Sequence, residues 1–159
     1  MEFRIADTEK LLKNYEPYHR SMEKVNNEKD RFAKKIESIR DEMEQIVQAS
    51  QKLILDDKTQ QEKAERFREL QSEAVEIEGT FRQEITQLQN SELENNFNQV
   101  SDIIKEWADK NDVKYVLNKI QFAYASDEAD CTDEVIELLK EKNLFEEYVE
   151  NDMVFEIQN

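Results

Sequence analysis

The sequence predicts a predominantly α-helical α+β protein, in which a long antiparallel coiled-coil hairpin stands on a small β-rich oligomerisation hub. Three observations predict this class. Apolar residues recur at steps of three and four over most of residues 22–107. Short β-favouring runs stand near both chain ends. Apolar and charged residues each make up 38% of the 159 residues, which leaves little apolar material for one compact core.

The first sixteen residues predict a strand and a short helix. The segment from residue 2 to residue 6 alternates and includes Phe3 and Ile5, as in a strand with one buried face. Asp7 or Thr8 can cap the helix TEKLLKNY that follows. Pro17 stops or redirects this helix, because proline fits the start of a helix but not its interior. We place residues 1–16 in the hub.

Residues 17–110 predict a helical hairpin, the arm, with its turn near residues 53–58. Leu53, Ile54 and Leu55 point in different directions around a helix, so they cannot share one seam. Two aspartates, a residue type that favours helix N-caps, follow at once. Each arm helix of about 40 residues would extend roughly 60 Å at 1.5 Å per residue. The apolar seam positions are Met22, Val25, Phe32, Ile36, Ile39, Met43, Ile46 and Leu53 in the first helix, and Ala64, Phe67, Leu70, Ala74, Ile77, Phe81, Ile85, Leu88, Leu93, Phe97, Val100, Ile104 and Trp107 in the second.

Two alternatives to this turn stay open. Gly79, the single glycine, lies inside the second helix pattern and indicates a bend, a close contact with the opposing helix, or the hairpin turn itself. A turn at Gly79 would leave much of the longer first helix without a partner. The heptad frame also continues in step past residue 58, as it would in one unbroken helix.

The last fifty residues complete the predicted hub. Residues 113–117 and 120–125 predict a strand pair with Asn118 and Lys119 at its turn. The acidic elbow SDEADCTDE follows, and Thr132 or Asp130 would cap the helix DEVIELLKEKN. The run MVFEI is strand-like and has no assigned partner. Because a hub made of residues 1–16 and 111–159 is small, we expect it to depend on association between chains.

Composition excludes several classes of function. A formal net charge of -16 argues against nucleic acid as a partner, because binding phosphates requires a local surplus of lysine and arginine. Residues 127–156 hold twelve acids and two bases, which indicates either a solvated surface or a site for cations or a basic partner. A single glycine cannot build a phosphate-binding loop. We therefore predict no cofactor and no enzyme activity.

The remaining candidate chemical groups lack partners in the sequence. Cys131 is the only cysteine, so it forms no intramolecular disulfide, and its acidic neighbours raise the pKa of its thiol. His19 has no second histidine or cysteine near it, which leaves no metal or nucleophile set. The elbow resembles a calcium loop, but Thr132 and Leu138 stand where glycine and glutamate are needed. The sequence predicts no catalytic and no metal-binding residues.

The chain opens without a basic run followed by an apolar one, and no apolar run is long enough to cross a bilayer. We expect no integral membrane span and a cytoplasmic location. The alternative is a periplasmic protein whose leader was removed.

Local sequence at both ends resembles a known family. The start FRIADTEKLLKNYEPY and the later segments VLNK, YAS and ADCTDEVIELL resemble the Skp/OmpH family of trimeric holdase chaperones, over residues 3 to about 140. The resemblance implies a β-barrel hub built from the terminal strands of three chains, with three tentacles around a cavity for unfolded outer-membrane proteins and no use of ATP. This chain is more acidic than well-known members and continues past the family's last helix. A phage-encoded relative with virion proteins as clients is one hypothesis.

The predicted function is that of an ATP-independent holdase chaperone, a homotrimer that holds unfolded client proteins between its arms. Several contacts of about 1.5–3 kcal/mol each would hold a client and still release it. The turn residues have a second interpretation, in which they only pack the hairpin turn. The predicted client-binding residues are Leu53, Ile54, Leu55, Phe67 and Phe81. The predicted oligomerisation residues are Phe3, Ile5, Val113, Tyr115, Leu117, Ile120, Phe122 and Tyr124.

An alternative function is structural. The same helices fit a coiled-coil adaptor or a scaffold component, for example of a virion, with one fixed protein partner.

Overall fold

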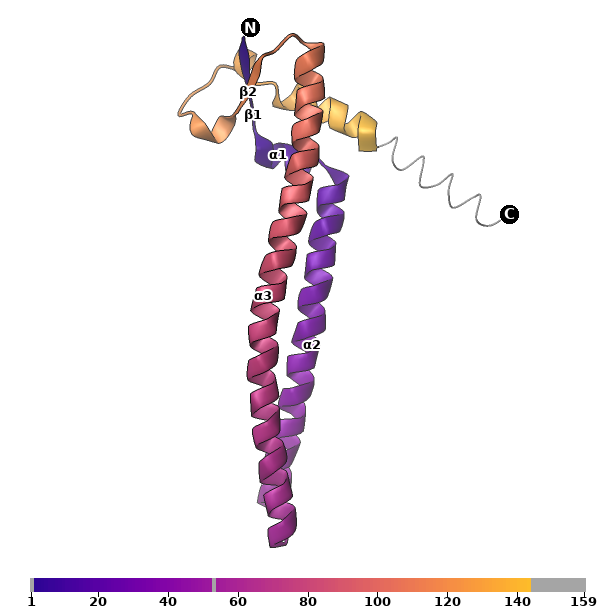
Figure 1. Ribbon diagram of the computed structural model, residues 1–159, viewed down its shortest axis with the longest axis vertical. Coiled ribbons are helices and arrows are strands. Elements are labelled where there is room, and N and C mark those ends of the chain that lie inside the picture. Colours follow the sequence, from indigo (N-terminus) through magenta and orange to yellow (C-terminus); the bar gives the residue numbers. More distant parts are fainter. Residues whose placement is uncertain (1, 53, 144–159) are drawn as a thin grey trace, which may run out of the picture. The chain divides into compact units, whose positions relative to one another are not determined.

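The computed structural model describes residues 2–52 and 54–143, and these form a predominantly helical α+β fold with a helical hairpin and one small sheet (Figure 1). The predicted fold class is confirmed. The predicted strand-like run MVFEI lies outside the described residues. The elements are β1 (Phe3–Ala6), α1 (Thr8–Lys13), α2 (Glu16–Lys52), α3 (Asp57–Lys110), β2 (Tyr115–Asn118), two 3₁₀ turns (Lys119–Gln121 and Asp127–Ala129) and a helix over residues 132–143.

The described chain divides into two compact units, each with its own contacts. The hub unit comprises residues 2–21 and 91–143, and the arm unit comprises Met22–Asn90. The sequence-based prediction instead gave the hub residues 1–16 and 111–159 and the arm residues 17–110. The difference arises because Val100 and Trp107, on the last turns of α3, are buried in the core of the hub unit.

In the arm unit, α2 and α3 pack through an apolar seam. The rings of Phe32 and Phe81 meet with their centroids 5.1 Å apart. Farther along, the guanidinium of Arg66 donates two hydrogen bonds to the carboxylate of Glu42, at 2.8 and 3.0 Å. This bidentate pair and the rings join the two helices of the unit. The buried apolar residues of the seam are Val25, Phe32, Ile39, Leu70 and Ile85.

The turn of the hairpin falls between Lys52, where α2 ends, and Asp57, where α3 begins. Asp56 caps α3, since its Oδ1 accepts a hydrogen bond from the Thr59 backbone N–H at 2.8 Å. Hydrogen bonds from Thr59 hold the pKa of Asp56 below its usual value. The alternative of one unbroken helix is therefore wrong.

Gly79 lies inside α3 and not at a turn. A Cβ atom built on it would meet no atom within 4 Å, so Gly79 marks no close contact with α2. Both alternatives based on this glycine, the turn and the close contact, are wrong.

The hub unit contains a two-stranded parallel sheet. Phe3 pairs with Tyr115 and Ala6 pairs with Asn118. On the other side of β1, Ile5 forms a bridge with Asp130, and the Cys131 backbone N–H donates to the Ile5 carbonyl at 2.8 Å. β1 is therefore the central strand of this small assembly. The core beneath it consists of Ala6, Leu11, Tyr15, Val100, Ile103, Trp107, Ala108, Val113, Cys131, Val135, Ile136 and Leu139.

The predicted strand pair between residues 113–117 and 120–125 is wrong. β2 pairs with β1, and residues 120–125 form no strand. Asn118 starts a 3₁₀ turn, because its Oδ1 accepts the Ile120 backbone N–H at 3.3 Å. A two-residue hairpin turn usually needs glycine or asparagine at positions with positive φ, and Lys119 does not suit such a position.

The helix over residues 132–143 is fixed at both ends of its described part. The helix begins at residue 132, and the Cys131 carbonyl accepts its first bond, from the Val135 N–H at 3.0 Å, so Cys131 holds the cap position predicted for Thr132 or Asp130. Asp130 Oδ1 accepts the Thr132 backbone N–H at 2.9 Å just before it. Near residue 143, Lys142 Nζ lies 2.7 Å from Glu106 Oε2 on α3. Lys142 and then Lys110 lower the pKa of Glu106 to about 2.

Candidate functional site

The clearest feature of the hub unit is a group of large apolar side chains at its surface. Tyr115 is 61% exposed, Ile120 82% and Tyr124 83%. Phe3 pairs with Tyr115 across the sheet, and Tyr115 and Leu117 alternate onto one face of β2, so these exposed side chains belong to adjacent positions. Exposed apolar side chains gathered on adjacent elements are a candidate interaction surface. We call the group the hub apolar surface; its members are Phe3, Tyr115, Leu117, Ile120, Phe122 and Tyr124.

Two of the eight residues predicted for oligomerisation belong to the interior of the single chain instead. Ile5 and Val113 are 1% and 9% exposed. Val113 packs in the hub core, and Ile5 lies on the central strand. Their role in the single chain is to hold the sheet against the helices.

The backbone of β2 adds hydrogen-bonding capacity beside this surface. In the described part of the chain β2 pairs with β1 alone, so its other edge has no strand partner. Such an edge exposes a row of N–H and C=O groups that can bind another strand. The unpaired edge belongs to a strand that carries two members of the hub apolar surface, Tyr115 and Leu117.

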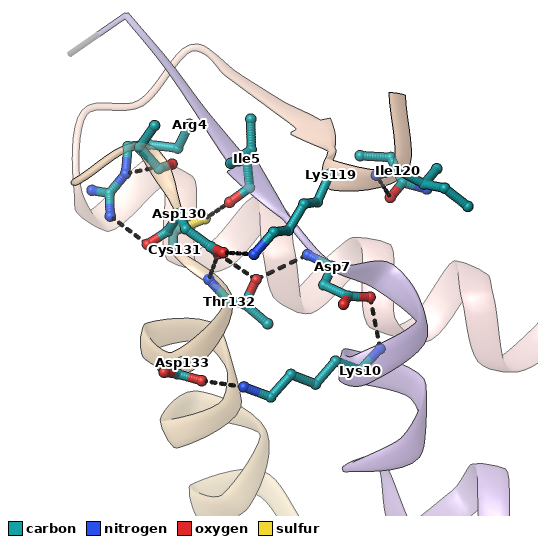
Figure 2. A network of polar contacts seen from close by, with 12 residues as sticks. Arg4, Ile5, Asp7, Lys10, Lys119, Ile120, Asp130, Cys131, Thr132 and Asp133 are labelled. Atoms are coloured by element: carbon teal, nitrogen blue, oxygen red, sulfur yellow. Dashed lines mark hydrogen bonds and ion pairs between the residues drawn. The ribbon is translucent and has the colours of Figure 1, made fainter. Parts of the chain in front are cut away.

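A network of polar contacts holds the segment around Asp130 against β1 and α1 (Figure 2). Arg4 donates to the carbonyls of Ala129 and Asp130, at 3.3 and 3.4 Å, and pairs with Glu134 at 2.6 Å. The Arg4 guanidinium also lies over the Trp107 ring, 5.3 Å from its centroid. One side chain thus joins the first strand, α3 and the start of the last described helix.

Asp130 and Thr132 form the second part of the network, shown in Figure 2. Thr132 Oγ1 accepts the Asp7 backbone N–H at 2.9 Å and donates to Asp130. Lys119 Nζ binds the other oxygen of Asp130 at 2.6 Å. Partial burial favours a higher pKa for Asp130, but the bonds from Lys119 and Thr132 outweigh it and lower the pKa to about 2. The carboxylate stays ionised and keeps all of these contacts at neutral pH.

Cys131 is fully buried beside this network, and its Sγ donates to the Ile5 carbonyl at 3.2 Å. Burial raises the pKa of its thiol to about 11. The direction agrees with the sequence-based prediction, although burial and not the acidic neighbours is the main cause. Cys131 is a core residue without a reactive thiolate at neutral pH.

A second candidate surface lies in the arm unit. An open groove of about 650 Å³ runs between α2 and α3. Its apolar floor is formed by Phe32, Ala33, Ile36 and Phe81, and charged side chains of both signs form its rim. A floor of this kind accepts an apolar side chain, while the rim stays solvated. We call it the arm groove.

The five predicted client-binding residues are spread over the arm unit. Ile54, in the turn, is fully exposed, and Leu55 is half-buried. Phe67 is half-buried and does not line the arm groove, whereas Phe81 does. Leu53 lies outside the described residues. The structure thus brings Phe81 together with Phe32, and it leaves Ile54 at a separate place along the hairpin.

Sequence reasoning missed Phe32 as part of this groove, and it placed Leu93 and Phe97 in the seam of α3, where the structure leaves both exposed. Phe32 and Phe81 were both recognised as seam positions. Counting outward from the turn at residues 53–58 along both helices would have placed them near each other. Leu93 and Phe97 gave no comparable signal, because their spacing of four fits a buried seam equally well.

The described residues, 2–52 and 54–143, hold no group of histidine, cysteine, aspartate or glutamate side chains arranged to bind a metal ion. None of the helices in this part of the chain is long and apolar enough to span a bilayer.

A comparison of the chain with known protein families identifies its family. The family described as outer membrane protein (OmpH-like) matches residues 3–139, which include β1, both long helices and β2. The chain belongs to the Skp/OmpH family. A comparison with curated proteins found no match.

Membership in the Skp/OmpH family bears on both candidate surfaces. The family is one of non-enzymatic chaperones, and the matched region contains all of the hub apolar surface and all of the arm groove. Residues 140–159 lie beyond the match. Among the described residues, both candidate surfaces therefore lie in the part that this chain shares with the family.

Proposed function

We propose that the protein is an ATP-independent holdase chaperone, a homotrimer whose arms hold unfolded or partly folded client proteins. Membership in the Skp/OmpH family supports the chaperone class. The observation that carries the proposal is the division of exposed apolar side chains between two units, with one group on the hub and another on the arm. A protein with one interface needs only one such group.

The hub apolar surface is the proposed site of self-association. Complete burial of each of its six side chains against another copy would stabilise the association by about 1.5–3 kcal/mol at most. The unpaired edge of β2 supplies backbone groups for the same contact. Three copies, as the family resemblance implies, would cover the surface of each chain with that of its neighbour.

The arm unit is the proposed site of client binding. Ile54 is fully exposed at the turn, and Phe32 and Phe81 offer an apolar floor in the arm groove. Each contact with a client is weak, and contacts from several arms add through effective concentration. A client held in this way dissociates once it begins to bury its own apolar side chains, so no nucleotide is needed for release.

The experiment that tests this function uses the purified full chain. Its molar mass is measured by light scattering, and its effect on the aggregation of several unrelated denatured proteins is measured with and without ATP. We expect three chains per particle and suppression of aggregation for most clients, unchanged by ATP. A monomer, or activity toward one cognate protein alone, would instead favour the structural adaptor. The expected cytoplasmic location, with the periplasm as the alternative, stays a prediction that fractionation of the source cells tests.

A further inference from the structure

A small polar cluster interrupts the apolar contact between α2 and α3 in the hub unit. Ser21 and Asn96 are 9% and 3% exposed. Asn96 Nδ2 donates to Ser21 Oγ at 2.8 Å and to the Glu92 carbonyl at 2.7 Å. Ser21 Oγ in turn donates to Glu92 Oε2 at 2.7 Å. We call Ser21, Glu92 and Asn96 the polar layer.

The neighbours of the polar layer along both helices are apolar and fully buried. Val25 lies four residues after Ser21 on α2, and Val100 lies four residues after Asn96 on α3; each is 1% exposed. Burying a serine and an asparagine stabilises a seam less than burying aliphatic side chains of similar size. Stability alone does not explain why polar residues occupy this position.

The polar layer differs from the rest of the seam in how strictly it depends on alignment. Aliphatic residues at steps of three and four fit several alignments of two helices, because any of them can face any other. Asn96 keeps its bond to the Glu92 carbonyl within α3 in any alignment, but the bond from its amide to α2 forms only when Ser21 faces it. A shift of α2 by one turn would bring Val25 or Pro17 to that place, and neither side chain can accept a hydrogen bond.

We propose that the polar layer fixes the axial register of α2 against α3, and so selects the hairpin with its turn after Lys52 over other pairings of the same two helices. The competing pairings are hairpins in which α2 is shifted along α3 by one turn or more. Such shifts keep the heptad pattern, which continues in step past the turn. They leave the Asn96 amide without its hydrogen bond to Ser21.

The consequence reaches every residue pair along the helices. In the observed register, Phe32 meets Phe81 and Glu42 meets Arg66. A shift of one turn would separate both pairs and change which residues form the turn. A layer that lowers stability but secures one alignment is the established role of a buried asparagine in coiled coils.

The test measures register directly. Glu42 and Arg66, whose side chains lie 2.8 Å apart, are both replaced by cysteine and joined with a short bifunctional thiol reagent. Cys131 stays in place because it is fully buried. The layer is then made apolar with Ser21→Ala and Asn96→Leu. We expect cross-linking within one chain to fall at least about twofold, and the melting temperature to stay the same or rise.

A matched control carries the same two types of substitution at exposed positions of α2, Asn26→Leu and Ser38→Ala, and should leave the cross-linking unchanged. If the double variant of the layer does not fold, Asn96→Ala alone provides the readout, since it leaves the bond between Ser21 and Glu92 possible. Undiminished cross-linking in the folded layer variant, or in Asn96→Ala if that is the variant used, would overturn the proposal. The cross-linking is measured without any client protein. A negative result would therefore overturn the register proposal and leave the proposed chaperone function untouched.

Discussion

Lys119 Nζ lies 2.6 Å from Asp130 Oδ2, and this ion pair joins the segment that follows β2 to the start of the helix over residues 132–143. The hydrogen bond to Asp130 raises the pKa of Lys119, while the pKa of Asp130 falls to about 2 despite its partial burial. Both groups are charged across the whole neutral range. The contact that holds the hub together beside β1 is therefore sensitive to acid and insensitive to mild base.

The first prediction concerns acid stability. The folded pKa of Asp130, about 2, lies below its ordinary value of 3.8, so its stabilisation is complete above that ordinary value and is lost as the pH falls toward 2. Asp130→Asn should lower the free energy of unfolding by about 1–2 kcal/mol at pH 7, and the difference from wild type should shrink below pH 4. Urea unfolding followed by circular dichroism at pH 7, 4 and 2.5 measures this. Asp109→Asn, at an exposed site on α3, is the control, and a difference that is constant with pH would contradict the prediction.

The second prediction concerns Gly79. Since its missing Cβ would meet nothing within 4 Å, alanine fits there without strain. Gly79→Ala should raise the free energy of unfolding by about 0.5–1 kcal/mol, because it reduces the conformational freedom of the unfolded chain. Chemical unfolding measures the change, with Glu76→Gln as control, at an exposed position of the same helix where both residues have about the same helix propensity. Destabilisation by Gly79→Ala would indicate that the helix bends or packs at this residue after all.

The third prediction concerns self-association through the hub apolar surface. Ile120→Ser together with Tyr124→Ser removes two side chains that are more than 80% exposed, so the single chain should keep its helix content. The association constant should fall at least about a hundredfold, as expected for the loss of two buried apolar contacts. Light scattering across a concentration series gives the result. Val75→Ser, at a 71% exposed position in the arm unit, is the matched control and should leave the assembly intact.

The fourth prediction concerns the hairpin turn. Replacing Leu53, Ile54 and Leu55 with serine should weaken the binding of unfolded clients about tenfold while the molar mass of the assembly stays unchanged. Affinity is measured with a fluorescently labelled denatured client. A shift to a smaller assembly would show that these residues serve the structure of the oligomer.

The fifth prediction concerns the arm groove. Phe81→Ala removes one of the two rings of its floor, and client affinity should fall about three- to tenfold with the molar mass unchanged. Leu88→Ala truncates a half-buried side chain on the same helix outside the groove, and it controls for general loosening of the arm. Equal loss of affinity in both variants would argue that the groove has no specific role.

Local signals in the sequence explain why the helices were predictable. The seam residues of α2 and α3 repeat every three or four positions, and Asp56 and Asp57 follow an apolar run that no single seam accommodates. No local signal in the sequence showed that β1 pairs with β2 and with the segment at Asp130. Phe3 pairs with Tyr115 and Ile5 with Asp130, across more than a hundred residues, and periodicity within one segment does not choose between distant partners.

The hub apolar surface and the arm groove were predictable only in part, because a local apolar pattern does not show what each residue packs against. An apolar residue in a strand-like run faces either the interior or a partner, and the pattern is identical in the two cases. Ile5 and Tyr115 were both assigned to association, yet one is buried in its own chain and the other is exposed. The groove at Phe32 and Phe81 depends on where two helices meet, which the apolar pattern of each helix leaves open and only the position of the turn indicates.

The position of β1 at the centre of the hub has a consequence for how the protein is made. Its two neighbours, β2 and the segment at Asp130, are synthesised more than a hundred residues later. During synthesis, α2 and α3 can therefore pack together before β2 and the segment at Asp130 are available to pair with β1. The hub unit closes only when nearly all of the described chain has left the exit tunnel, so association through the hub apolar surface can begin only after the two long helices have formed.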